Sequence, residues 1–211
     1  MLNTKTEELS RSIVDPIFLV FEITESVEDL YKVWYYDGLD TKEFEKFVSE
    51  KRKREYLAVR LAMRSLLGKD VLICYTKEGK PFFNDNSFQI SISHSGKWVA
   101  VMAHPTDIVG IDIECPTDKI KNLYTRFLSK TEQEELYNGN NIAQLQLAWS
   151  AKEALYKIIG KQAVDFAKQL RLFPFEVKPQ GEIIAQHIES KTLYTLFYIQ
   201  SAEYTLVYCR A

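Results

Sequence analysis

The most constraining feature of the chain is a short run of alternating apolar and acidic residues, Val-Gly-Ile-Asp-Ile-Glu, which ends at Glu114. This period-two pattern predicts a β-strand, so the side chains of Asp112 and Glu114 leave the same face of it. The apolar residues from Ile108 to Ile113 predict that the strand is deeply buried. Two buried carboxylates repel each other, so this pair needs protons or a cation to neutralise it.

A second run, Trp149-Ser-Ala-Lys-Glu-Ala-Leu-Tyr-Lys157, predicts a helix that carries Glu153, with Lys157 one turn further on. If this helix packs against the strand, three carboxylates converge, and hard oxygen ligands of this kind favour Mg²⁺. Each part also has an ordinary explanation, because the acidic pair suits a solvated edge strand and Glu153 with Lys157 suits a helix-surface ion pair. Taken together, the two runs point to phosphate chemistry.

The composition bounds the fold and the class of partner. A chain of 211 residues is long enough for one large domain or for two domains of about 100 residues each. Hydrophobic residues make up 46% and charged residues 27%, which is typical of a globular protein. The net charge of −2 lacks the basic excess of proteins that bind nucleic acid, so we expect no nucleic-acid partner.

The sequence also bears on the cellular compartment. No stretch reaches the roughly 20 apolar residues of a membrane span, and the N-terminus lacks the basic-then-apolar order of a signal peptide. Cys74, Cys115 and Cys209 are odd in number and widely spaced, which suits a reducing cytosol and forms no zinc pattern. We therefore expect a cytoplasmic protein with no membrane partner.

The order of predicted elements divides the chain into two halves, residues 1–104 and 105–211, at the break His104-Pro-Thr-Asp107. For the first half the patterns predict a strand at 17–23, a helical region from Asp40 or Thr41 to Gly68, and strands at 71–76, 88–93 and 97–103. For the second half they predict a strand at 108–113, helices near 131–138 and 142–159, and strands around 171–177, 182–188, 193–200 and 203–209. Each half runs strand, helix and several strands, which predicts an α+β fold of two similar α/β halves.

Three further motifs carry polar side chains. Ser91-Ile-Ser-His-Ser-Gly96 places Ser93 and His94 near the end of a strand, where hydroxyls and an imidazole suit phosphate binding. A hydrolase triad does not follow from this pair, because the chain has no Gly-x-Ser-x-Gly elbow. Gly79-Lys80-Pro81 predicts a turn that presents a lysine, although a plain hairpin turn also explains it. The basic run Lys51–Arg54 is too short to indicate nucleic-acid binding.

The order of these motifs resembles that of the Sfp-type 4'-phosphopantetheinyl transferases. The matching segments are Gly79-Lys-Pro, Ile92-Ser-His-Ser-Gly96, Gly110-Ile-Asp-Ile-Glu114 and Trp149-Ser-x-Lys-Glu-x-x-x-Lys157. Arg126-Phe-Leu-Ser-Lys-Thr-Glu132 also fits the segment that lies between the last two motifs in this family. The resemblance covers the part of the chain between residues 50 and 160 and rests on the combined order and spacing.

The resemblance implies a reaction and a set of residue roles. The family transfers the phosphopantetheine arm of coenzyme A to a serine of an acyl or peptidyl carrier protein and releases 3',5'-ADP. Asp112, Glu114 and Glu153 match its Mg²⁺ ligands, and Lys157 matches the lysine at the coenzyme A phosphates. Lys80, Ser93 and His94 match residues around the adenosine and the 3'-phosphate. Members of this length are pseudo-dimers with coenzyme A in the cleft, which implies a monomer.

Some assignments remain open at this point. Arg52, Arg54 and Arg60 are candidates for the 3'-phosphate, with Arg54 and Arg60 preferred. The attacking serine must lose a proton, and Glu153 is the hypothesised base, directly or through a metal-bound water. Glu132 is the weaker candidate for this role.

The carrier protein and the reaction class leave alternatives. A docking patch for an acidic carrier is expected at the basic run 51–54 or at the loop after Lys119-Ile-Lys121. The chain also suits a non-catalytic carrier-protein binder, or a Mg²⁺-dependent hydrolase of nucleotide pyrophosphates. Neither the physiological carrier, nor tolerance of acyl-coenzyme A, nor the choice of Mg²⁺ over Mn²⁺ follows from the sequence.

Overall fold

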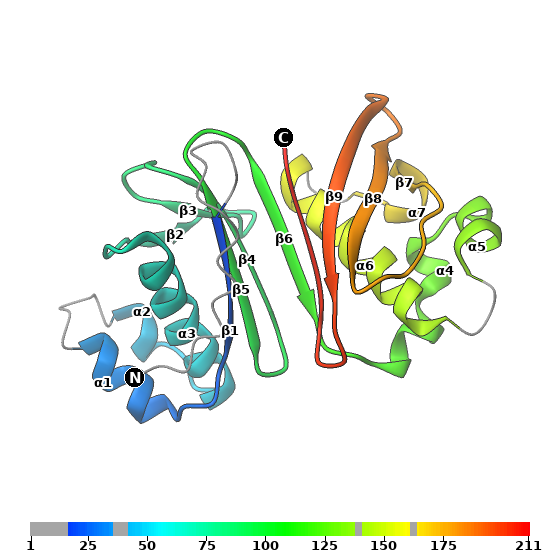
Figure 1. The fold of residues 1–211 in the computed structure, drawn as a ribbon. Coiled ribbons are helices and arrows are strands. Elements are labelled where there is room, and N and C mark those ends of the chain that lie inside the picture. Colours follow the sequence, from blue (N-terminus) through cyan, green and yellow to red (C-terminus); the bar gives the residue numbers. More distant parts are fainter. Residues whose placement is uncertain (1–16, 36–41, 138–140, 161–163) are drawn as a thin grey trace.

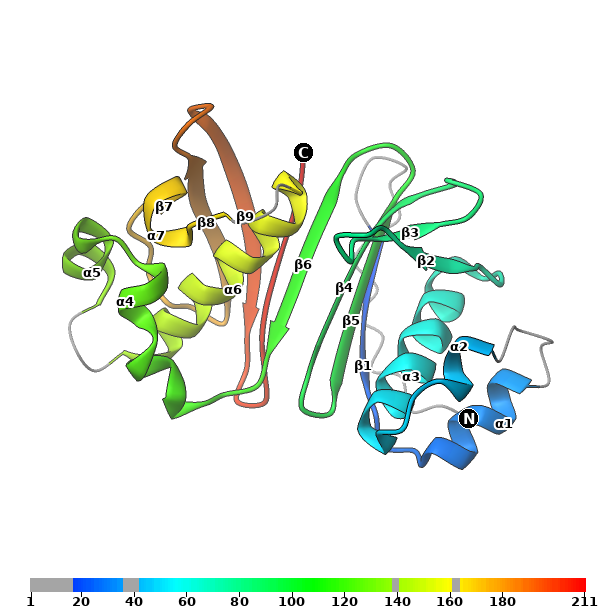
Figure 2. The ribbon, with the colours of Figure 1, turned by 180° about the vertical axis from the view of Figure 1, so that it is seen from behind.

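A computed structural model describes residues 17–35, 42–137, 141–160 and 164–211. Figure 1 shows two β-sheets that face each other at the centre, with the helices on the two outer sides. Figure 2 shows the same arrangement from behind. The α+β class expected from the sequence is confirmed.

The first half of the chain builds one sheet and its helical cover. Strands β1, β5 and β4 pair antiparallel in that order, and β2 with β3 forms a separate hairpin. Helix α3 packs on β1 and β5 and ends at Gly68, whose φ of 66° belongs to the left-handed region that favours glycine. The elements are β1 (Ile17–Glu22), α1 (Val27–Tyr35), α2 (Lys42–Glu45), α3 (Glu50–Leu67), β2 (Ile73–Tyr75), β3 (Pro81–Phe83), β4 (Gln89–Ser95) and β5 (Trp98–His104).

The expected single helical region before Gly68 is wrong in one respect. The described part of it consists of the short helix α2 and the longer helix α3, with an interruption at residues 46–49. The Ser49 side chain accepts a hydrogen bond from the backbone N–H of Arg52 and so begins a new helix. Val48, within this interruption, is 99% exposed and so adds nothing to the buried side of either helix. The predicted start residues, Asp40 and Thr41, lie outside the described residues.

The second half builds a larger antiparallel sheet in the order β6-β10-β9-β8-β7. Helix α6 packs against β6, β10 and β9. The elements are β6 (Val109–Glu114), the 3-10 helix η1 (Asp118–Asn122), α4 (Tyr124–Phe127), α5 (Lys130–Leu136), α6 (Ile142–Ile159), α7 (Phe166–Gln169), β7 (Leu170–Leu172), β8 (Gln180–His187), β9 (Thr192–Gln200) and β10 (Thr205–Arg210). The strand expected at 171–177 ends early, before Pro174, which has no N–H to donate to a ladder.

Strands β4 and β6 join the two halves through side chains. The Ser91 hydroxyl accepts a hydrogen bond from the backbone N–H of Ile111 at 3.0 Å. Further along, Ser93 donates to Asp112 at 2.9 Å and Ser95 donates to Glu114 at 2.7 Å. The partners advance together along both strands, so β4 and β6 run parallel. The serines expected to hold a phosphate therefore form the junction between the halves.

The buried residues divide in the same way. One hydrophobic cluster draws only on residues from Leu19 to Ala103, and a second draws only on residues from Ile120 to Cys209. A third, which includes Trp98, Met102 and Ile111, lies between the two sheets. Across the described residues, no helix is both long enough and apolar enough to span a membrane.

Candidate active site

A cavity of about 970 Å³ opens between the two halves. Its first wall comes from α3 and β4, and its second wall from β6 and α6. The first wall includes Arg52, Glu55, Tyr56, Arg60, Ser93 and His94, and the second includes Asp112, Glu114, Trp149, Glu153 and Lys157. The cavity thus brings most of the residues singled out in the sequence to one place.

Asp112 is the most buried acid of the second wall, with 4% of its surface exposed. Its Oδ1 accepts hydrogen bonds from Ser93 Oγ and from Lys157 Nζ, both at 2.9 Å. Lys157 Nζ also donates to the backbone carbonyl of Ile111 at 2.7 Å. The other carboxylate oxygen, Oδ2, is buried and has no hydrogen-bond partner. An unsatisfied buried oxygen of this kind is uncommon and is suited to receiving a cation.

Glu114 is held from both sides by fixed donors. Ser95 Oγ donates to its Oε2 at 2.7 Å, and Trp149 Nε1 donates to its Oε1 at 3.2 Å. Burial raises the pKa of Glu114, and the neighbouring charge of Asp112 adds to this rise. Trp149, whose ring packs against Phe127 and Phe166, thus also orients a carboxylate in the cavity.

Helix α6 comes close to β6 at Ala154, the residue after Glu153, because the strand carries a glycine there. A Cβ at Gly110 would lie 2.1 Å from the backbone oxygen of Ala154, so only glycine lets α6 approach this closely. Burial raises the pKa of Glu153 to about 7, and the charge of Asp112 is the next cause. Glu153 is therefore a carboxyl group that can exchange a proton near neutral pH.

The acidic residues do not form a closed metal site by themselves. Within the described ranges, no group of three or more His, Cys, Asp or Glu side chains is arranged to hold a metal ion. Mg²⁺ is often bound through only one or two carboxylates, and waters and substrate phosphates complete its shell. The unpartnered Oδ2 of Asp112 fits this open kind of site.

The first wall combines apolar and aromatic residues with two arginines, a histidine and two glutamates. The guanidinium of Arg60 lies over the ring of Tyr56, 3.3 Å from its centroid. His94 Nδ1 lies 3.5 Å from Glu55 Oε1, and Arg52 donates to Glu55 Oε2 at 3.2 Å. Burial lowers the pKa of His94, although Glu55 opposes this effect. The wall therefore presents one guanidinium group and an imidazole at a buried carboxylate, and a second guanidinium group stacked on Tyr56.

Arg54, a preferred candidate for the 3'-phosphate, is placed elsewhere. Its guanidinium donates to the backbone carbonyl of Ile23 at 3.2 Å, on the far side of α3, and it does not line the cavity. Arg52, which the sequence analysis ranked lower, does line it. The two residues differ because positions two apart on a helix face different directions.

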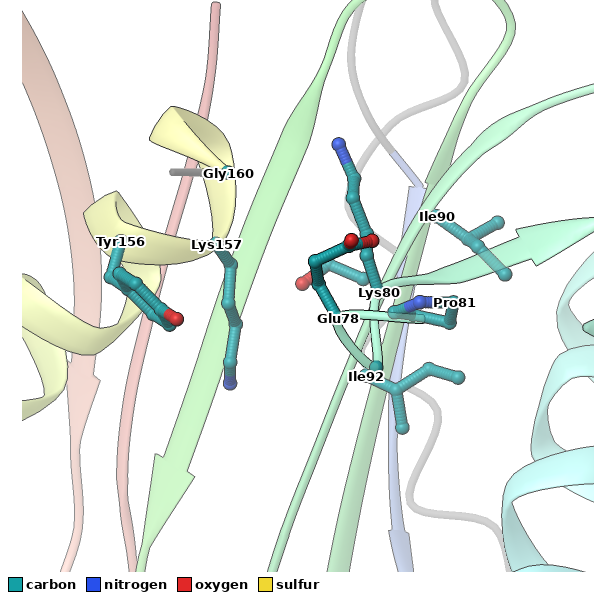
Figure 3. A pocket seen from close by; sticks show the side chains of 10 residues that line it. Glu78, Lys80, Pro81, Ile90, Ile92, Tyr156, Lys157 and Gly160 are labelled. Atoms are coloured by element: carbon teal, nitrogen blue, oxygen red, sulfur yellow. The ribbon is translucent and has the colours of Figure 1, made fainter. Parts of the chain in front are cut away.

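Lys80 lines a smaller pocket of about 220 Å³ that adjoins the cavity. Figure 3 shows Tyr156 and Lys157 of α6 on one side of this pocket, and Glu78, Lys80 and Pro81 of the β2–β3 turn on the other. Lys157 lines both spaces, whereas Lys80 does not line the larger one. The structure therefore separates Lys80 from Ser93 and His94, with which the sequence analysis had grouped it.

Glu132, the weaker candidate for a base, belongs to the core. It has no exposed surface and accepts hydrogen bonds from Lys152 Nζ and from the backbone N–H groups of Ser129 and Leu172. It does not line the cavity. The Lys152 ammonium is also fully buried, so the pair acts within the protein and not on a ligand.

The sequence analysis missed Glu55 as a functional residue. The signal that points to it is its i, i+3 spacing from Arg52, which allows an ion pair on one face of a helix. No local sequence pattern predicts that Glu55 lies near His94, because the two residues lie on different elements. Glu55 is thus a site residue that only the approach of His94 of β4 to α3 reveals.

Comparisons with known proteins agree with this geometry. Residues 108–209 match the 4'-phosphopantetheinyl transferase superfamily. The 4'-phosphopantetheinyl transferase Sfp of Bacillus subtilis is 30% identical over 158 residues, which are 63% of this chain and 70% of that protein. A phosphopantetheinyl transferase of Thraustochytrium sp. is 30% identical over 152 residues, 58% of this chain and 53% of that protein.

Coverage and identity differ among the relatives. A second Bacillus subtilis enzyme, the 4'-phosphopantetheinyl transferase ffp, is 33% identical over 96 residues, 44% of this chain and 42% of that protein. The matched part of the chain spans about half the length of two curated relatives: 51% of a putative 4'-phosphopantetheinyl transferase of Haemophilus influenzae and 53% of the Thraustochytrium enzyme. The match to Sfp is longer and covers 70% of that protein. The chain therefore belongs to the 4'-phosphopantetheinyl transferase family.

Proposed function

We propose that the protein transfers the 4'-phosphopantetheine arm of coenzyme A to a serine of an acyl or peptidyl carrier protein and releases 3',5'-ADP. The observation that carries this proposal is the cavity whose first wall carries two arginines, a histidine and aromatic rings and whose other wall is acidic with one lysine. Coenzyme A has a matching division, because its 3'-phosphate and pyrophosphate occupy different parts of one molecule. The cavity volume of about 970 Å³ lies within the range of small-molecule sites.

The first wall suits the nucleotide end of coenzyme A. Arg52, Arg60 and His94 offer cationic or donor groups for the 3'-phosphate, and guanidinium groups bind phosphate with paired hydrogen bonds. The ring of Tyr56 lies beside them and suits contact with the adenine base of coenzyme A. Ser93 donates to Asp112 in this structure, so its part is to link the two walls.

Lys157 lies where the two spaces meet and suits the pyrophosphate. Its side chain is 25% exposed and its ammonium donates to Asp112, so a further N–H can donate to a phosphate oxygen without loss of that partner. Lys80 faces the same ligand from the smaller pocket. Together these lysines would counter the negative charge that grows on the leaving group.

Asp112, Glu114 and Glu153 are the residues that would hold Mg²⁺. When bound there, the ion supplies charge neutralisation at the pyrophosphate oxygens. The unpartnered Oδ2 of Asp112 and the raised pKa values of Glu114 and Glu153 fit such a site, because a nearby cation favours the ionised carboxylates.

Glu153 is also our candidate for the general base. Where no cation is bound, burial raises the pKa of Glu153 to about 7, so its carboxylate can then accept the proton of the carrier serine near neutral pH. The side chain lines the cavity beside Lys157, so it can reach a hydroxyl that approaches the pyrophosphate. Glu132 is excluded from this role by its burial in the core.

The remaining expectations belong to the same proposal. We infer a monomeric, cytoplasmic enzyme in which residues 1–104 and 105–211 act as two halves around the site. Its partners would be coenzyme A and a carrier protein, with neither nucleic acid nor membrane. Arg52 of the basic run 51–54 lines the cavity, and this run is a docking candidate for an acidic carrier.

One assay tests the reaction directly. The protein is incubated with coenzyme A, Mg²⁺ and an apo-carrier protein, and the carrier is weighed by mass spectrometry. A mass gain of one phosphopantetheine arm is expected. Cleavage of coenzyme A without modification of the carrier would show a pyrophosphate hydrolase, and tight carrier binding with neither reaction would show an adaptor.

A substitution tests the role of Glu153. Glu153→Gln keeps the shape of the side chain but removes its charge, so we expect turnover to fall at least about a hundredfold. Glu182→Gln makes the same change on an exposed part of β8 and should leave turnover unchanged. Near-normal turnover of Glu153→Gln at saturating Mg²⁺ would exclude Glu153 as both ligand and base.

A further inference from the structure

The first wall of the cavity contains one buried carboxylate, Glu55, which is unusual beside an anion site. Its side chain is 8% exposed, while the neighbouring Arg52 side chain is 57% exposed. Arg52 donates to Glu55 Oε2 at 3.2 Å, and His94 Nδ1 lies 3.5 Å from Glu55 Oε1. Lys51 Nζ lies 3.8 Å from the same Oε1. Three cationic or titratable groups thus meet at one carboxylate.

The contacts of Glu55 connect two separate elements. Arg52 belongs to α3, and His94 belongs to β4, so the carboxylate fixes one side chain from each. An exposed arginine loses much rotamer freedom when it binds a ligand, and this loss weakens binding. A carboxylate that already restrains the arginine removes part of that loss. The geometry therefore suits preorganisation of the first wall.

We propose that Glu55 is a positioning residue that fixes Arg52 and His94 to receive the 3'-phosphate of coenzyme A. This inference rests on the proposed function, because it takes coenzyme A as the ligand of the cavity. It assigns Glu55 a specific effect, namely discrimination between coenzyme A and dephospho-coenzyme A, which differ only in that phosphate.

The charges around His94 give Glu55 a second way to act. Lys51 and Arg52 of α3 and Lys157 of α6 all disfavour a positive imidazole, as does burial. Glu55 opposes these effects and favours the protonated ring. A protonated His94 donates a charge-assisted hydrogen bond to a phosphate, whereas a neutral ring binds it more weakly. Without Glu55, the imidazole would be neutral over a wider range of pH.

Two other accounts of Glu55 predict different results. If Glu55 only tied α3 to β4, its loss would lower stability and weaken both ligands equally. If its negative charge mainly repelled the phosphate, its loss would strengthen the binding of coenzyme A. The ratio of the two affinities therefore separates the three accounts.

The test compares Glu55→Gln with the wild type by calorimetric titration of coenzyme A and of dephospho-coenzyme A, without a carrier protein. We expect coenzyme A to bind about tenfold more weakly to the variant, which is the order of affinity lost when one rotamer-rich side chain is no longer held in place. The affinity for dephospho-coenzyme A should stay unchanged. Glu50→Gln is the matched control, since Glu50 is exposed on the first turn of the same helix and does not line the cavity.

A second measurement follows His94 itself. The chain has only 3 histidines, so their ring signals can be resolved by NMR and that of His94 identified by its loss in His94→Asn. The pKa of His94 should fall in Glu55→Gln and stay near the wild-type value in Glu55→Asp, which keeps the charge. An unchanged pKa in Glu55→Gln would remove the electrostatic part of the inference.

The outcomes separate this inference from the proposed function. Equal weakening of both ligands, no weakening, or stronger binding of coenzyme A would overturn the role of Glu55 alone. A wild-type protein that binds no coenzyme A would overturn the proposed function as well. If Glu55→Gln does not fold, Glu55→Asp serves instead, because its shorter reach should weaken coenzyme A a few-fold and spare dephospho-coenzyme A.

Discussion

Replacing Lys152 tests how the second half holds its helices together. The ammonium has no exposed surface and forms an ion pair with Glu132 at 2.7 Å. It also donates to the backbone carbonyls of Phe127, Phe166 and Leu170, at distances from 2.8 to 3.0 Å. Lys152 therefore connects α4, α5, α7 and β7 to α6. Lys152→Met fills a similar volume but removes every one of these hydrogen bonds.

The expected magnitude follows from the groups left behind. Breaking a buried ion pair by removing one partner lowers stability by about 3–5 kcal/mol, because the other charge stays buried. Glu132 keeps the N–H groups of Ser129 and Leu172, which reduces its part of the loss. The three carbonyls lose a donor, and each unsatisfied group adds about 1 kcal/mol or more. We expect a loss of at least about 4 kcal/mol, a large share of the roughly 5–15 kcal/mol typical of whole domains.

The assay is urea unfolding followed by circular dichroism. Lys168→Met is the control, because Lys168 is 83% exposed and pairs with Asp165 on the surface, where the loss should stay below about 0.5 kcal/mol. The double variant Lys152→Met with Glu132→Gln should lose less than the sum of the single variants, since it leaves no unpaired charge. A loss below about 1 kcal/mol for Lys152→Met, or strict additivity in the double variant, would refute the reasoning.

Three further predictions concern the active site. Gly110→Ala should push α6 away from β6 at Ala154, lower the free energy of unfolding by about 3 kcal/mol and abolish carrier modification, which denaturation and the mass assay check. Arg60→Ala should raise the KM for coenzyme A about tenfold or more, because Arg60 lines the cavity. Arg54→Ala, which loses its hydrogen bond to Ile23, should change this KM less than twofold. Equal effects of the two substitutions would contradict the placement of both residues. Removal of divalent cations with EDTA should stop the transfer, and added Mg²⁺ should restore it; full activity in EDTA would exclude a metal role for the acidic wall.

Much of the fold could be predicted from periodicity. The helix expected at 142–159 has those bounds as α6, and the expected strands other than 171–177 begin and end within two residues of observed ones. These elements carry long or strictly alternating apolar patterns, which local sequence determines well. Helix α1 and strand β3 were not predicted, because one is a short amphipathic helix and the other has three residues. The interruption before α3 depends on the single cap Ser49.

The candidate site was predictable in part. The pattern around Asp112 and Glu114 shows that they share a face of a strand, and their motif order pointed to Glu153 and Lys157. Sequence spacing does not show which way a helical arginine faces when both faces of the helix are covered, so Arg54 was preferred over Arg52.

Buried charges were the hardest part to predict. A lysine within a helix is expected to be solvated, and Lys152 is buried only because segments distant in the sequence bring their carbonyls to it. Glu132 is buried for the same reason, as the ion-pair partner of Lys152. Such groups depend on tertiary packing and leave no periodic signal in the sequence.

The hydroxyl-bridged contact between β4 and β6 also has a thermodynamic consequence. Apart from the cluster between the two sheets, the halves have separate hydrophobic cores, and in this contact they meet through serine side chains in place of a backbone ladder. A ligand that touches both walls binds only while they are apposed, so its binding free energy adds to the adhesion of the halves. A ligand at one hundred times its Kd contributes about 2.7 kcal/mol in this way. Bound substrate would then raise the free energy that is needed to separate the two halves.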